Sequence, residues 1–276
     1  MRIRRLQVAD AAACVVTCSA VGWRSDEARW CRLLAIGDGF CAEAADGTLA
    51  GTVIVNRFGD RLATIAMMLV LPSLQRQGVG RRLLTEAMAA AGDAVVYLYA
   101  TAEGRRLYEP FGFVADGALA ERFEGNVQRD ARAQGGVRAM HPDDLPAVCA
   151  LDARAQGGAR KALLEALAAI SERALVVERR GHVVGFGLAW RVDDVWALAP
   201  IVAEDDAIAR SLAAALAADA PVPVRIDLEP GERALREWAP HAGLVTVGTS
   251  LRMIDKGRSL PGDRRLVRAM AGRAYG

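Results

Sequence analysis

The sequence predicts an α/β (α+β) protein built from two tandem domains of similar size. Three observations support this fold class. The chain has 276 residues, which exceeds one typical domain and allows two hydrophobic cores. Residues 63–91 contain an apolar strand, a glycine loop and an amphipathic helix, in that order. Parts of the first half also return in the second half at a constant spacing, which indicates a duplication.

The internal repeat has a spacing of 134 residues from the first expected strand to the third. Ile3-Arg4-Arg5-Leu6 returns as Val137-Arg138-Ala139-Met140, and Leu49-Ala50-Gly51 returns as Val183-Val184-Gly185. Each copy should be one domain. We therefore expect a first domain over residues 1–130 and a second domain over residues 131–276.

In the first copy, apolar periodicity predicts the strands and helices. Ser25-Asp26-Glu27 is typical of a helix start, and Asp46-Gly47 is typical of a hairpin turn. The expected elements are a strand at 2–6, a helix at 9–20, a second helix that follows this start signal and runs to 36, strands at 40–45, 49–58 and 63–71, a helix at 79–91, a strand at 94–100, a helix at 104–111 and a strand at 113–123.

The second copy repeats this order after a polar, arginine-rich linker over residues 125–136. Residues 255–276 are polar with an arginine-rich helical stretch, and the sequence assigns them no role. The expected elements of the second copy are a helix at 161–170, strands at 174–178, 183–192 and 195–202, a helix at 206–216, a strand at 222–228, a helix at 232–241 and a strand at 244–253.

The loop between the central strand and helix contains two glycines, Gly78 and Gly80. Without side chains, they allow backbone N–H groups to approach a bulky anion such as a diphosphate, and the helix that follows points its positive end at the same place. An ordinary strand-to-helix turn is the alternative interpretation. A Walker A loop is excluded because Arg81 and Arg82 follow Gly80, and a dinucleotide fingerprint is excluded because Leu83 replaces its third glycine.

The loop resembles the Q/R-x-x-G-x-G/A motif of the GNAT N-acetyltransferase superfamily, with Gln75, Gly78 and Gly80 at its three defined positions. Val70-Leu71-Pro72 resembles the V-x-P that precedes this loop, and residues 107–113, LYEPFGF, resemble the family's [LF]-Y-x-x-x-G-F segment. The three matches occur in the family's order. The chain is similar to the bacterial tandem type, with an intact first domain and a divergent second one.

This resemblance implies that each domain has a mixed, mostly antiparallel sheet flanked by helices, and that acetyl-CoA is the cosubstrate. It also implies direct attack of an acceptor amine on the thioester in a ternary complex. Strand edges at 69–71 would pair with the pantetheine amides, the loop amides would hold the pyrophosphate, and Arg76, Arg81 or Arg82 would add charge. The implied cofactor-binding residues are Leu69, Val70, Leu71, Gln75, Arg76, Gln77, Gly78, Val79, Gly80 and Arg81.

The resemblance makes Tyr108 the general acid, with helix packing as its alternative role. The general base is open between Glu43, Glu103 and a chain of waters. Trp23 and Trp30 flank the region where this fold admits its acceptor. One departure from the family is Ala102-Glu103-Gly104, where an Asn that contacts the pantetheine arm is common, so the resemblance assigns no such contact here.

The second copy lacks the features that carry this chemistry. Its loop, Ala203-Glu204-Asp205-Asp206, has no glycine and three carboxylates, which would repel a diphosphate. Ala239 stands opposite Tyr108 when the two copies are aligned. The sequence therefore predicts one working site and one degenerate copy.

Composition limits the remaining classes. A net charge of +2 implies no nucleic-acid or membrane partner, and no apolar run approaches the ~18 residues of a membrane span. Five cysteines without a C-x-x-C pair favour reduced thiols and the cytoplasm, and no spacing predicts a metal site. We expect an N-acetyltransferase acting on a small-molecule amine. The alternatives are a protein or aminoglycoside-type acceptor, or a non-catalytic acyl-CoA sensor, and a homodimer stays open.

Overall fold

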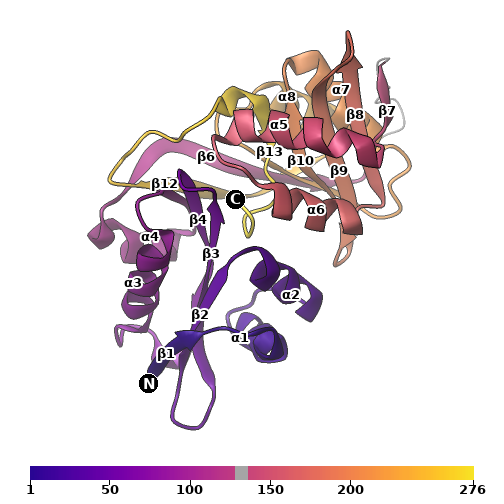
Figure 1. Ribbon diagram of the computed structural model, residues 1–276. Coiled ribbons are helices and arrows are strands. Elements are labelled where there is room, and N and C mark those ends of the chain that lie inside the picture. Colours follow the sequence, from indigo (N-terminus) through magenta and orange to yellow (C-terminus); the bar gives the residue numbers. More distant parts are fainter. Residues whose placement is uncertain (128–135) are drawn as a thin grey trace.

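In the computed structural model, which describes residues 1–127 and 136–276, thirteen strands form one continuous sheet with helices on both faces (Figure 1). Most of the expected linker, residues 128–135, lies outside the described residues. The strand order is β1-β2-β3-β4-β5-β12-β6-β11-β13-β10-β9-β8-β7. The predicted α/β class with a mostly antiparallel sheet is confirmed.

The first copy forms the lower half of Figure 1, with α1 and α2 on one face of its strands and α3 and α4 on the other. Asp26 caps α2 by accepting a hydrogen bond from the Arg29 amide (2.6 Å), as its position before the helix predicts. The elements are β1 (Arg2–Arg5), α1 (Ala11–Ala20), α2 (Glu27–Ile36), β2 (Asp38–Glu43), β3 (Leu49–Phe58), β4 (Leu62–Val70), α3 (Val79–Ala91), β5 (Val95–Ala100), α4 (Ala102–Tyr108) and β6 (Phe113–Gly125).

The second copy repeats this arrangement, with its own apolar clusters on the two faces of the sheet. Its elements are β7 (Val137–Ala139), α5 (Leu145–Gln156), α6 (Lys161–Ile170), β8 (Arg173–Arg179), β9 (His182–Val192), β10 (Val195–Ala203), α7 (Asp206–Ala217), β11 (Val224–Leu228), α8 (Ala234–His241), β12 (Val245–Asp255) and β13 (Val267–Ala269).

An ion-pair triad supports the duplication. Arg4 joins Asp10 (2.8 Å) and Glu43 (3.0 Å), which ties the first strand to the following turn and to β2. The hydrogen bonds that Asp10 accepts from Arg4 lower the pKa of the Asp10 carboxyl group. The same contacts recur in the second copy among Arg138, Asp144 and Glu178.

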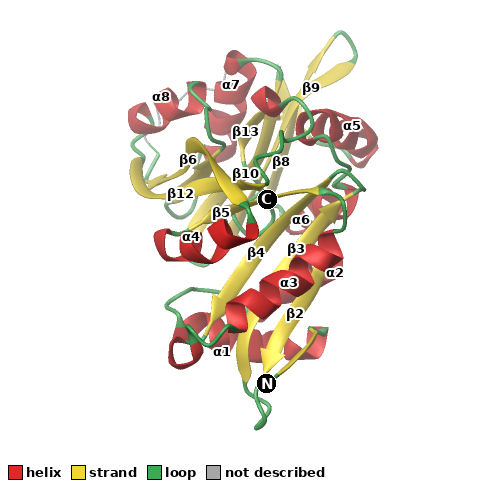
Figure 2. Cartoon of the chain, turned by 90° about the vertical axis from the view of Figure 1, so that its left-hand side faces the viewer, coloured by secondary structure: helices red, strands yellow, loops and turns green. Residues whose placement is uncertain are grey.

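The two copies exchange their last long strands. β12, from the second copy, lies between β5 and β6 of the first, with Leu251 opposite Ala100 on one side and Leu119 on the other. β6, from the first copy, in turn lies between β12 and β11. Figure 2 shows the resulting sheet passing without a break from one half to the other.

The segment after β12 differs from the sequence expectation. The predicted helical stretch within residues 255–276 is wrong, because these residues form one short 3₁₀ turn and the strand β13. The sequence signal was misleading because two of the arginines that suggested a helix, Arg264 and Arg268, are largely buried in ion pairs. Arg264 bonds Glu229 and Arg268 bonds Glu232.

We expect residues 1–130 alone not to form a stable domain, because the position between β5 and β6 would be empty and both strands would expose unpaired backbone groups. Thermal unfolding followed by circular dichroism tests this. The matched control fuses residues 244–256 to this fragment through a short linker, since Val245 lies opposite Glu124 at the end of β6. A fragment 1–130 that melts cooperatively and keeps the full chain's turnover would contradict the expectation.

Candidate active site

The candidate site of the first copy starts where β4 and β5 separate. The two strands are parallel neighbours at only three residue pairs, of which Thr64 and Tyr97 form the last. Beyond Thr64, no strand within the described residues pairs with this edge of β4. The backbone groups of β4 that face the gap can therefore pair with an extended ligand, as they would with another strand.

A β-bulge shapes β4 beside this gap. Met67 has a φ of 50°, and the register against β3 shifts between Thr52 and Ile54. The buried Thr52 hydroxyl donates to the Met67 carbonyl (2.9 Å), which holds the bulge in place. Because a bulge interrupts the ladder, it changes the direction of peptide groups next to the gap.

The glycine loop lies at the end of β4, as the sequence predicts. The Gln75 side chain donates to the Val70 carbonyl (3.1 Å) and so ties the loop to the strand. Gly78 has a φ of 77°, and a Cβ placed on it would have no atom within 4 Å. The backbone conformation therefore favours glycine, and the space beside it is open.

The start of α3 offers uncapped amides to this open space. Gly78 is the N-cap residue, and among the described residues no side-chain cap hydrogen bond is made there. These amides and the helix dipole favour an anion. Arg81 lies over the Phe111 ring (5.7 Å), and Arg82 donates to the Met1 carbonyl (3.3 Å), while Arg76 is exposed.

Tyr108 lies on α4, and the preceding residue, Leu107, packs against Gly80 at the start of α3. The contact is close, because a Cβ added to Gly80 would lie 3.3 Å from the Leu107 side chain. The Tyr108 ring is 7% exposed and contacts Phe113 edge-on, with the two ring centroids 5.8 Å apart. Burial raises the pKa of Tyr108, so its hydroxyl keeps its proton at neutral pH. The hydroxyl makes no hydrogen bond to any of the residues that the structure describes, which leaves it free to donate to a ligand.

The two candidate bases have different environments. Glu43 belongs to the ion-pair triad with Arg4, and the copy of this triad in the second half argues for a structural role. Its strand, β2, is also separated from the open edge of β4 by β3. Glu103 lies exposed in the first turn of α4, directly beyond β5. We therefore keep Glu103, and not Glu43, in the proposed mechanism.

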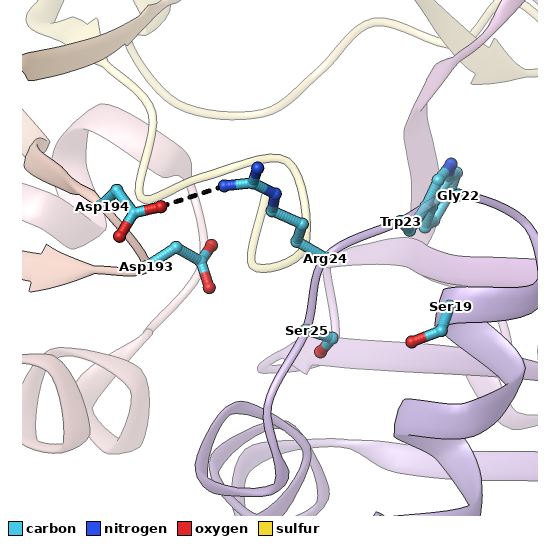
Figure 3. Close-up of a pocket in the computed structure, with 7 residues that line it drawn as sticks. All are labelled: Ser19, Gly22, Trp23, Arg24, Ser25, Asp193 and Asp194. Atoms are coloured by element: carbon cyan, nitrogen blue, oxygen red, sulfur yellow. Dashed lines mark hydrogen bonds and ion pairs between the residues drawn. The ribbon is translucent and has the colours of Figure 1, made fainter.

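The two tryptophans that the sequence places near the acceptor region differ in their exposure to solvent. Trp30, on α2, is fully buried in the core, whereas Trp23 is 40% exposed in the loop between α1 and α2. This loop borders an open cavity of about 550 Å³, which Figure 3 shows between the two copies. The cavity is lined by Ser19, Gly22, Trp23, Arg24, Ser25, Asp193 and Asp194.

In the second copy, the corresponding gap is filled by the chain itself. β10 and β11 are parallel neighbours as far as Leu198 and Ile226, and β13 then enters between them. Ala269 lies opposite both Ile201 of β10 and Leu228 of β11. This strand takes the place at which an extended ligand would pair.

Arg268 of β13 carries a positive charge to the start of α7. Its guanidinium bonds Asp206 (2.7 Å), Glu232 (3.1 Å) and the Ala203 carbonyl (3.1 Å). Asp205 caps α7 by accepting from the Ile208 amide (2.8 Å). An acyl-CoA does not fit this groove, because its strand position and its helix start are both occupied.

Comparison with known proteins agrees with this geometry. Two family models, both described as "Acetyltransferase (GNAT) domain", match residues 36–115 and residues 148–268. Together the matches cover most of the chain, one in each copy. The protein belongs to the GNAT acetyltransferase family. The second match ends at Arg268, so it includes the start of the strand that fills the second groove of this GNAT protein.

Two curated relatives are similar over most of their length. An uncharacterized N-acetyltransferase of Bacillus subtilis, YitH, is 25% identical over 84% of this chain and 81% of its own. Holothin acyltransferase of a Pseudoalteromonas species is 24% identical over 82% of this chain and 77% of its own. These relatives and the family matches identify this GNAT protein as an acyltransferase.

Solved structures support the tandem fold. A putative acetyltransferase from Pyrococcus horikoshii has a TM-score of 0.83 and 21% identity, and the match covers 100% of this chain and 95% of that one. A tandem GNAT protein from the clavulanic acid biosynthesis pathway has a TM-score of 0.65 and 13% identity, over 94% and 99% of the two chains.

No helix among the described residues is long and apolar enough to cross a membrane. No group of three or more His, Cys, Asp or Glu side chains within residues 1–127 and 136–276 could hold a metal ion.

Sequence reasoning missed the groups that act between the two copies. β13 has a weak signal in the apolar residues of Leu266-Val267-Arg268-Ala269-Met270, but three residues are too few to predict a strand. Tyr99 donates to Glu229 across 130 positions of the chain. No local pattern could have predicted that pair.

We expect one acetyl-CoA to bind per chain, because only the first groove is open. Isothermal titration calorimetry measures the stoichiometry, and Gly78→Glu should abolish binding by placing a carboxylate in the open space at the helix start. The matched control is Asp205→Gly, which removes the helix cap of the second copy and should leave one site. A stoichiometry of two, or binding that survives Gly78→Glu, would show that the site is misplaced.

Proposed function

We propose that this protein transfers the acetyl group of acetyl-CoA to a primary amine of a small molecule, and that it does so in the first copy alone. The contrast between the two grooves carries this proposal. The first groove has an unpaired strand edge and an uncapped helix start, whereas the second is filled by β13 and by Arg268.

Binding in this proposal uses main-chain groups. Leu69 to Leu71 offer a strand edge to the pantetheine amides, and Gln75 to Arg81 offer N–H groups to the pyrophosphate. Arg76 is exposed at the loop and can approach a phosphate without losing another partner. Binding of the cosubstrate therefore depends on the backbone geometry of the loop, which Gly78 and the Gln75 side chain maintain.

The chemistry is a direct attack. The neutral amine forms a bond to the thioester carbonyl carbon, the carbon–sulfur bond breaks, and the nitrogen loses a proton. Tyr108 donates its proton to the departing thiolate and is reprotonated from solvent. Its raised pKa keeps the donor protonated over the pH range in which the amine is partly neutral.

The proton of the amine goes to water or to Glu103 in this proposal. Glu103 is exposed and carries no ion pair within the described residues, so it is accessible to a water that contacts the acceptor. Glu43 is left out because Arg4 already binds it.

A small-molecule acceptor is supported by one relative, whose name describes it as an acyltransferase for holothin. An aminoglycoside-type acceptor would be favoured by unpaired carboxylates in the cavity between the copies. Asp193 and Asp194 do line that cavity, but they face Arg29 (3.5 Å) and Arg24 (3.2 Å). The two carboxylates therefore add no net negative charge to the cavity, and these ion pairs do not favour a polycationic acceptor such as an aminoglycoside.

The proposal places the reaction in the cytoplasm, where the five free cysteines would stay reduced. Its direct test is the release of free thiol from acetyl-CoA in the presence of a panel of small primary amines, with an unfolded peptide and an aminoglycoside as competing acceptor classes. Amine-dependent release with the peptide alone would exclude the small-molecule class. Thiol release that never depends on an amine would exclude acetyl transfer.

We expect Tyr108→Phe to lower kcat by roughly 10²-fold, near the lower end of the range for one positioned general acid. A free thiol has a pKa of about 8.5, so its thiolate leaves readily without full protonation. The ring packing against Phe113 is retained, and the dissociation constant of acetyl-CoA should change little. Steady-state kinetics and calorimetry on the same variant separate the two quantities. Turnover at the parent rate would make Tyr108 a packing residue.

A further inference from the structure

Two tyrosines on β5 point to the same face of the sheet but have different partners. Tyr97 lies at the last residue pair between β4 and β5, and Tyr99 lies two residues farther, beside the gap. Their rings meet edge-on, with centroids 5.9 Å apart. The Tyr97 hydroxyl is buried and makes no hydrogen bond within the described residues, whereas the Tyr99 hydroxyl donates to Glu229 Oε2 at 2.9 Å.

Glu229 belongs to the second copy, where it directly follows β11, and it is 2% exposed. Its other carboxylate oxygen accepts from Arg252 of β12 and from Arg264 (2.6 Å) in the turn before β13. A buried carboxylate with two arginine partners has a fixed position, because moving it would leave charges uncompensated. Burial, followed by the charge of Glu229, raises the pKa of Tyr99, so the hydroxyl acts as a donor.

The strand that fills the second groove also fixes the backbone at Glu229. The Glu229 amide donates to the Arg268 carbonyl (3.4 Å), and Ala269 pairs with the preceding residue, Leu228. Arg264, on the same segment, stacks over the Tyr97 ring at 5.5 Å. The closed second copy is therefore connected directly to β5 of the first.

Tyr99 lies on the face that α1 and α2 cover, together with Met67 and Leu69 of β4. These side chains come from the two strands that border the gap. We place the acceptor on this face as well, because the exposed Trp23 and the cavity of Figure 3 lie at the loop between α1 and α2. The opposite face carries α3, the loop and Tyr108.

We propose that Glu229 is a positioning residue for acyl transfer in the first copy. By accepting a hydrogen bond from the Tyr99 hydroxyl, it fixes β5 at the gap between β4 and β5, on the face from which the amine approaches. This inference rests on the proposed function. It gives the second copy a role in the reaction that does not require its own cofactor site. The competing explanation is that Glu229 serves only to neutralise Arg252 and Arg264.

Tyr99→Phe separates these explanations, because it removes the hydroxyl and leaves the carboxylate with both arginines. We expect kcat/KM for the amine to fall about three- to tenfold, with the dissociation constant of acetyl-CoA unchanged, since the loss of one hydrogen bond loosens the orientation of the acceptor side. The matched control is Tyr97→Phe, which removes an unbonded hydroxyl from the same face of the same strand and should have parent kinetics.

A second variant, Glu229→Gln, tests whether Tyr99 acts through Glu229. It should lower the melting temperature, because Arg264 loses its counter-charge and Arg252 keeps only Asp116. Combined with Tyr99→Phe, it should cause no further loss in kcat/KM below that of the more severe single variant, since the hydroxyl and the carboxylate that accepts from it act as one pair. Additive kinetic losses would contradict a shared role.

Hydrogen exchange keeps the test independent of turnover. In the presence of acetyl-CoA, amides of residues 98–101 should exchange faster in Tyr99→Phe than in Tyr97→Phe. Equal exchange, or equal kinetics in the two variants, would overturn the positioning role. A parent enzyme that releases no thiol with any amine counts against the proposed function, and the exchange experiment then still decides this inference.

Discussion

The whole structure depends on the pairing of β6 with β12. These two strands come from different copies, and each completes the sheet of the other copy. Backbone hydrogen bonds supply the specificity of such pairing, and an unpaired strand in the middle of a sheet would cost far more than a lost surface contact. The two copies are consequently one folding body, although each has its own apolar clusters and its own order of elements.

Local elements could be predicted from the sequence because their causes are local. The Asp26 cap and the Asp46-Gly47 turn each act within a few residues, and the boundaries they predict agree with the structure. The loop of the candidate site was predicted for the same reason, since Gln75 and Gly78 shape it through neighbouring atoms.

The exchange of strands and the filled groove could not be predicted, because they depend on contacts between distant segments. β5 contains an apolar run that suits any central strand, so nothing in it specifies β12 as its neighbour. The arginines after residue 255 suggested a helix. Arg264 and Arg268 are instead buried, because the buried carboxylates of Glu229 and Glu232 pair with them. The role of Tyr108 is a prediction from resemblance, and its burial is compatible with that role.

The position of β12 also affects the order in which the chain can fold during synthesis. Residues 1–125 leave the ribosome well before β12 is made, and N-terminal domains usually fold first. Here β5 cannot complete its pairing until β12, which begins at Val245, has been synthesised. Until then, the edges of β5 and β6 stay open to other chains, which makes the nascent first half a natural client for chaperones and a point where slow translation carries an aggregation risk.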